Sequence, residues 1–171
     1  NQKQLHACVD KYELTVQALK EAADLGSNRH CWLVFCAGVE HAIHASEILN
    51  DMGIPSGYVH SGNKDYPMSS VQRDETLAHL ESGKLRAICN NSVLSVGYDN
   101  TKIDMIVHLK PMKSSRQWVQ ELGRGTRPNY EPGYDLSQKQ GRRDAIADGI
   151  KRDCLVLDFA ENTARLGPIN D

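Results

Sequence analysis

Short apolar segments alternate along this chain with longer segments whose apolar residues recur at helical spacing. The apolar segments, which we expect to be strands, cover residues 31–36, 56–60, 85–89, 104–109 and 154–158. Helical spacing covers residues 4–25, 39–52, 69–82 and 114–122. Strands that alternate with helices imply βαβ units. The sequence therefore predicts an α/β fold, with a parallel sheet and helices on both of its faces.

The composition fits one globular domain, with 171 residues, 40% of them hydrophobic and 25% charged. No apolar run approaches the length of a membrane span, so we expect no membrane partner. The net charge of −2 argues against a globally basic nucleic-acid-binding protein. Residues 110–152, however, contain ten Lys or Arg against five Asp or Glu. This local excess either meets phosphate groups or belongs to a solvated loop.

The five cysteines are odd in number, and no two have the C-x-x-C spacing of a zinc site. Four of them lie in or beside the expected strands, which favours buried free thiols in a cytoplasmic protein. His30, Cys31, Cys36, His41 and His44 are close in sequence, but their spacing matches no standard ligand framework. We therefore expect no bound metal in this chain.

Residues 120–127 read Q-E-L-G-R-G-T-R and suggest phosphate chemistry. On a helix, Arg124 and Arg127 would share one face, because residues three apart are neighbours there. Two guanidinium groups aimed the same way suit a phosphate-rich ligand, which accepts their forked hydrogen bonds. The alternative is a solvated basic end of a helix.

A second polar segment follows the third expected strand, at the sheet edge where ligands of such folds bind. Gly97 can adopt a backbone conformation closed to other residues, and Asp99 can accept hydrogen bonds from a ribose or orient an arginine. Asn91 and Ser92 are short polar residues of the kind that holds a phosphate. Taken alone, a turn glycine explains this segment equally well.

Four segments together resemble the motifs of superfamily 2 helicases. Residues 120–127 resemble motif VI, Q-x-x-G-R-x-x-R, and residues 91–99 resemble motif V, with Asn91 in place of the usual Thr. Residues 33–42 resemble motif IV, and the sequence H-S-G at 60–62 resembles motif IVa. They occur in the order of the family, each after its expected strand. Over residues 32–158 the chain thus resembles the second RecA-like domain of these helicases, and its ending resembles DEAD/DEAH-type helicases of bacteria and phages.

The resemblance implies that ATP lies between two RecA-like domains and that the first domain holds its phosphates and Mg²⁺. The phosphate loop of that first domain is not found in this sequence, and the Asp-Glu pair at 74–75 lies at the start of a polar helix rather than after an apolar strand. By resemblance, Arg127 is the arginine finger, Arg124 lies beside it on the γ-phosphate, and Gln120 contacts the phosphate or the attacking water. Gly97 and Asp99 would contact the sugar side of the nucleotide. We expect this chain alone to be inactive as an ATPase.

The resemblance also implies a nucleic-acid track, with DNA expected in preference to RNA. The residues that match the positions where the family contacts the nucleic-acid backbone are Ala37, Gly38, His60, Gly62, Asn91 and Ser92. Because the chain begins with Asn1 rather than Met, we expect it to be a piece of a longer protein. Residues 1–28 would then connect to the first RecA-like domain, and residues 29–171 would form the helicase C-terminal domain, with an insertion at 128–153. The tail at 161–171 is expected to be extended.

Two other functions fit parts of the sequence. A RecA-like fold can serve as a non-catalytic module that binds protein or nucleic acid, although such a module has no need of the arginine pair. A doubly wound enzyme could use Cys36 as a nucleophile, but a C-x₅-R phosphatase loop would need Arg at the position of Ala42.

Overall fold

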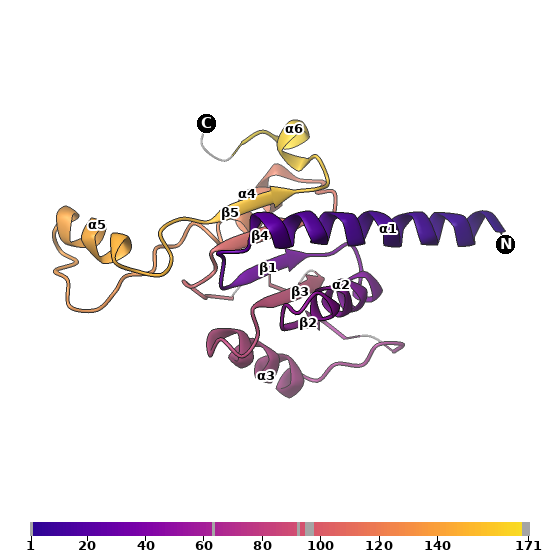
Figure 1. Cartoon of the computed structure of the whole chain (residues 1–171), viewed down its shortest axis with the longest axis horizontal. Helices are drawn as coiled ribbons and strands as arrows, with labels where there is room; N and C mark the ends of the chain where they lie inside the picture. The colour runs from indigo at the N-terminus through magenta and orange to yellow at the C-terminus, as the bar shows by residue number, and fades with distance from the viewer. Residues whose placement is uncertain (1, 63, 92, 95–97, 169–171) are drawn as a thin grey trace.

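The computed structural model describes residues 2–62, 64–91, 93–94 and 98–168. It contains a five-stranded, all-parallel sheet in the order β2-β3-β1-β4-β5 (Figure 1). The strands are β1 (Trp32–Phe35), β2 (Ser56–His60), β3 (Ala87–Asn91), β4 (Met105–His108) and β5 (Leu155–Asp158). The helices are α1 (Gln2–Leu25), α2 (Val39–Asp51), α3 (Ser70–Glu81), α4 (Ser115–Leu122), α5 (Lys139–Ala147) and α6 (Asn162–Leu166). The predicted α/β fold with a parallel sheet is confirmed.

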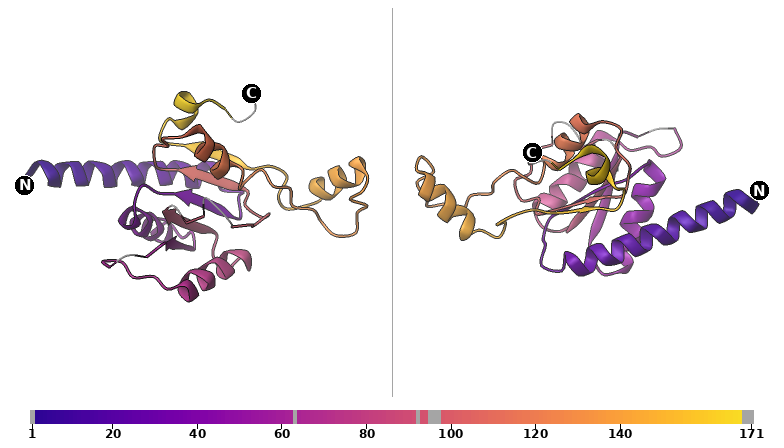
Figure 2. Two further views of the ribbon diagram at one scale, coloured as in Figure 1. Left: turned by 180° about the vertical axis from the view of Figure 1, so that it is seen from behind. Right: turned by 90° about the horizontal axis from the view of Figure 1, so that it is seen from above.

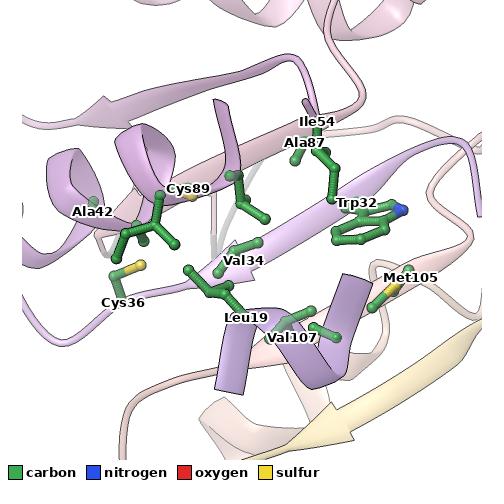
Figure 3. Packing of buried hydrophobic residues seen from close by; sticks show 14 residues of the cluster. Leu19, Trp32, Val34, Cys36, Ala42, Ile54, Ala87, Cys89, Met105 and Val107 are labelled. Atoms are coloured by element: carbon green, nitrogen blue, oxygen red, sulfur yellow. The ribbon is translucent and has the colours of Figure 1, made fainter. Parts of the chain in front are cut away.

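Side chains of the central strands alternate between two buried cores, as expected for a sheet covered on both faces. Trp32 and Val34 of β1 point into a core closed by α1 and α2, which Figure 3 shows from close by. Leu33 and Phe35 point into the opposite core, to which α3 contributes Leu80 and α4 contributes Trp118 and Leu122. All four residues of β1 are fully buried, which accounts for the continuous apolar run in the sequence.

Helix α3 begins where the sequence predicts a cap. The Ser69 hydroxyl accepts a hydrogen bond from the Gln72 amide at 3.1 Å, and the Gln72 side chain accepts one from the Ser69 amide at 2.9 Å. This reciprocal pair is a capping box, which satisfies two donors at the helix start. The helix therefore starts within one residue of the expected position.

The prediction of an extended tail is wrong, because residues 162–166 form helix α6. The two carboxylate oxygens of Asp158 accept hydrogen bonds, one from the Thr163 amide at 2.7 Å and one from the Asn162 side chain at 3.0 Å. Asn162 is fully buried and donates to the Lys110 carbonyl, while its own oxygen accepts from the Met112 amide. These contacts with distant residues, rather than an apolar repeat, position the short helix.

The first part of α1 and the whole of α5 extend away from the sheet at opposite ends of the domain (Figures 1 and 2). Helix α1 continues past the carboxyl ends of the strands, and α5 lies beyond their amino ends within residues 128–153. The end of α1 is fixed by Arg86, which donates to the carbonyls of Gly26, Ser27 and Arg29. Within the described residues, no helix has the length and apolarity required to cross a membrane.

Candidate nucleotide-binding site

The guanidinium groups of Arg124 and Arg127 meet at one backbone carbonyl. Nη1 of Arg124 donates to the Tyr98 oxygen at 2.7 Å, and Nη1 of Arg127 lies 3.5 Å from the same atom. Helix α4 ends at Leu122, so both arginines lie on the turn that follows it and the expectation of a shared helix face is wrong. Their convergence comes from the turn, which folds back over the segment before β4.

This turn approaches the sheet closely because Gly125 has no side chain. A Cβ atom at Gly125 would lie 2.9 Å from Cδ1 of Ile106 and would collide with Sγ of Cys154. Any other residue would push the turn away from β4 and from the start of β5. The glycine between the two arginines therefore sets the depth at which both guanidinium groups lie.

Arg127 also forms an ion pair with Asp99, the residue next to Tyr98. The side chains of both partners are accessible, at 38% for Arg127 and 70% for Asp99, whereas Arg124 is only 8% exposed. Burial lowers the pKa of Arg124, as does the nearby Arg127, and Asp99 opposes this effect. Arg124 stays charged, since arginine is not deprotonated in proteins. The site thus presents one buried and one accessible cation side by side.

A buried polar network, which sequence reasoning missed, holds the helix before this turn. Nζ of Lys110 lies 2.9 Å from one carboxylate oxygen of Glu121, and Nδ1 of His108 lies 3.6 Å from the other. The His108 ring stacks on Phe35 at 4.7 Å and meets Trp118 edge-on at the same distance. Glu121 lies in α4, His108 is the last residue of β4, and Lys110 follows that strand. The network therefore fixes the helix against the sheet.

Two other predicted nucleotide contacts are less defined. Gln120 lies in the last turn of α4 and is exposed, so it is accessible to a ligand. Gly97 lies outside the described residues. The structure therefore brings together Arg124, Arg127 and Asp99 from the predicted set.

The residues predicted to contact nucleic acid follow three adjacent strands. Ala37 and Gly38 follow β1, Gly62 follows β2, and Asn91 ends β3, where it is paired with His60 across the sheet. Ser92 lies outside the described residues. Nδ2 of Asn91 donates to the Cys36 carbonyl at 3.2 Å, which ties the ends of β1 and β3 together.

The loop after β2 is shaped by its histidine and glycine. His60 is 2% exposed, burial lowers its pKa, and its Nδ1 accepts a hydrogen bond from the Gly62 amide at 3.0 Å. Gly62 has φ +75°, which favours glycine. An open hollow of about 550 Å³ lies beside this loop, lined by Ser61, Gly62, Pro67, Met68, Ser69 and Gln72. The buried imidazole therefore organises the backbone around this hollow.

Comparison with known proteins gives the same family as the motifs. The helicase conserved C-terminal domain family matches residues 10–129. A curated relative named "Putative mitochondrial ATP-dependent helicase irc3" from Schizosaccharomyces pombe is 28% identical over 82% of this chain and 19% of its own length. The chain spans less than a fifth of the length of the curated relatives it matches.

Solved structures share the fold at low sequence identity. The Escherichia coli DEAD-box protein SrmB, solved with the regulator RraA, matches with a TM-score of 0.63 and 15% identity over 86% of this chain and 70% of its own. The Mycobacterium smegmatis helicase Lhr, solved with single-stranded DNA and AMP-PNP, matches with a TM-score of 0.54 and 23% identity over 61% of this chain and 14% of its own. The chain belongs to the helicase conserved C-terminal domain family, and its fold is that of solved helicase domains.

Proposed function

We propose that this domain is the C-terminal motor half of an ATP-dependent helicase or translocase. In this proposal Arg127 is the arginine finger and Arg124 stands beside it at the γ-phosphate. The observation that carries the proposal is the convergence of both guanidinium groups on the Tyr98 carbonyl, next to Asp99. A pair of cations fixed at one point can stabilise the charge that develops as a γ-phosphoryl group leaves.

The other half of the nucleotide site would lie on a first RecA-like domain, with residues 1–28 as the connector. We assign the Mg²⁺ of ATP to that first domain, as the resemblance to superfamily 2 helicases implies. Arg127 and Gln120 are accessible on this domain, as closure of the first RecA-like domain over them requires. Opening and closing of the two domains would then convert ATP hydrolysis into movement along a strand.

We further propose that nucleic acid runs across the loops after β1, β2 and β3. The loop after β1 contains the small residues Ala37 and Gly38, and the loop after β2 contains Gly62, which suits contacts with phosphates that are indifferent to sequence. The Lhr helicase was solved with single-stranded DNA and Saccharomyces cerevisiae Dbp5 with RNA, and we propose DNA as the substrate to test before RNA.

The test is an ATPase assay of a polypeptide that carries both RecA-like domains, with single- and double-stranded DNA and RNA as stimulants. We expect hydrolysis that rises with nucleic acid, and more with DNA than with RNA. The isolated 171-residue chain is the matched control and should not hydrolyse ATP. Absence of hydrolysis with every nucleic acid would reject the motor and favour the non-catalytic binding module.

A further inference from the structure

Lys151 is a buried cation at the point where residues 128–153 return to the sheet. It is 6% exposed, and its Nζ donates to the Arg127 carbonyl at 2.6 Å and to the Thr101 carbonyl at 2.9 Å. Burial lowers the pKa of Lys151, and the nearby Cys154, Asp104 and Cys31 oppose that effect. Burying an ammonium group is costly unless its donors find acceptors. The two carbonyls are thus the specific partners that keep this cation in place.

The two carbonyls belong to the two sides of the arginine site. Arg127 is the proposed finger, and Thr101 lies two residues after Asp99, with which the finger is paired. A second link joins the same segments, since the Thr101 hydroxyl donates to Oδ1 of Asn129 at 2.8 Å. Lys151 therefore bridges the backbone of the finger and the backbone of the segment that orients it.

The backbone of Arg127 is also restrained by the residue that follows it. Pro128 follows it directly, and a proline limits the preceding residue to extended conformations. With its φ and ψ limited by Pro128, its carbonyl held by Lys151 and its guanidinium paired with Asp99, the finger has little freedom to turn away. Pre-set geometry of this kind matters for phosphoryl transfer, where misplacement of a charged group lowers the rate.

We propose that Lys151 is a positioning residue for the arginine finger, acting on the Arg127 backbone without touching ATP; this inference rests on the proposed function of Arg127. The alternative is that Lys151 only holds residues 128–153 against the sheet, which would be a role in folding alone. The two roles differ in which measured quantity changes. Loss of positioning lowers the turnover number kcat, whereas loss of folding lowers the melting temperature.

The first experiment compares variants of the polypeptide with both RecA-like domains. Lys151→Met removes the donors, Lys151→Arg keeps the charge and donors, and Arg152→Met removes the exposed neighbouring cation as the matched control. We expect Lys151→Met to lower kcat of nucleic-acid-stimulated ATP hydrolysis by about tenfold while KM for ATP changes less than about twofold. Lys151→Arg should restore most of the turnover, and Arg152→Met should behave as wild type. A folded Lys151→Met protein with normal kcat overturns the inference.

A double-mutant cycle separates positioning from a general structural role. In an Arg127→Ala background, measured as single-turnover rates, Lys151→Met should have no further effect because the group it positions is gone. The same tenfold loss in both backgrounds would overturn the inference. If Lys151→Met does not fold, Lys151→Gln takes its place in the same cycle. Normal hydrolysis by Arg127→Ala alone would instead reject the proposed function, so the two failures are distinguishable.

Discussion

The guanidinium of Arg127 pairs with the carboxylate of Asp99, which lies 28 residues earlier in the chain. The pair joins the segment before β4 to the turn after α4, and Arg124 makes the same connection through the Tyr98 carbonyl. Asp99 thus holds an accessible arginine in one direction. This relationship explains why residues 98–99 and residues 124–127, though separate in sequence, lie together.

Removal of the Asp99 charge should affect hydrolysis more than stability. Both side chains of its pair are partly exposed, and such pairs contribute little to folding, so the melting temperature of Asp99→Asn should stay close to that of wild type. Because Arg127 would no longer be held in one direction, we expect Asp99→Asn to lower nucleic-acid-stimulated kcat by about tenfold. Asp153→Asn is the matched control, because Asp153 forms another exposed pair, with Arg29. Equal kcat values for wild type and Asp99→Asn would refute the orienting role.

Breaking the buried Lys110–Glu121 pair should destabilise the domain strongly. The Glu121 side chain is fully buried and that of Lys110 is 9% exposed, so Glu121→Ala leaves a buried cation without its carboxylate. We expect a loss of about 3–5 kcal/mol in the free energy of unfolding, measured with urea on the 171-residue chain. The double variant Lys110→Met/Glu121→Leu should recover part of this loss. Asp74→Asn, which breaks an exposed pair with Arg73, should cost less than about 1 kcal/mol.

The buried His108 should make the domain less stable in acid. Its pKa is lowered from 6.5 to about 3, mainly by burial and also by the nearby Lys110, while Asp158 opposes both effects. Between these values the unfolded chain binds a proton that the folded domain excludes, so stability is complete above pH 6.5 and falls as the pH falls toward about 3.

We expect a loss of about 3 kcal/mol in the free energy of unfolding between neutral pH and about pH 4, measured by urea unfolding. His108→Gln should flatten this dependence. His79→Gln, at an exposed position of α3, should leave it unchanged. An unchanged slope in His108→Gln would show that other groups control the acid response.

Two glycines with nearly the same positive φ allow a test of the nucleic-acid track. Gly62 has φ +75° and lies at the hollow after β2, whereas Gly83 has φ +76° and lies at the end of α3. A Cβ at Gly62 would also lie 3.0 Å from the Met68 carbonyl oxygen, while the space at Gly83 is open. We expect Gly62→Ala to weaken binding of fluorescent single-stranded DNA by about fivefold at low salt, and Gly83→Ala to leave it unchanged.

Binding by the isolated chain should be weak and should weaken further with salt, because phosphate contacts release counterions. Fluorescence anisotropy at two salt concentrations measures this dependence. Tight binding that is insensitive to salt, or equal effects of the two glycine substitutions, would contradict the proposed track.

The number and order of the strands were predictable from the short segments between turn residues, but β3 lies at 87–91, two residues later than predicted, because the polar Asn90 and Asn91 also pair with neighbouring strands. The bounds of β2 agree with the sequence prediction, and β1 is only one residue shorter at each end. Helix α6 was not predictable from periodicity, since the Asp158 carboxylate and the Lys110 carbonyl hold it through contacts that exist only after folding. Tertiary contacts of this kind override local signals.

The geometry of the candidate site was not predictable from the sequence. The motif spacing identified Arg124 and Arg127, yet their convergence depends on the turn at Gly125 rather than on a helix face. Glu121 reads as a solvated residue of a polar helix, and only packing against β4 shows it fully buried beside Lys110. Lys151 lies in a charged segment without a motif, so its contact with the Arg127 carbonyl required the structure.

The most direct test of the arginine-finger assignment is ATP turnover by Arg127→Ala in the polypeptide with both RecA-like domains, at saturating ATP and nucleic acid. Arg116→Ala, at an exposed position of α4, is the matched control. The proposal predicts that Arg127→Ala folds normally and loses about 10³-fold or more in turnover, while Arg116→Ala keeps wild-type turnover. Near-normal turnover by a folded Arg127→Ala protein would contradict it.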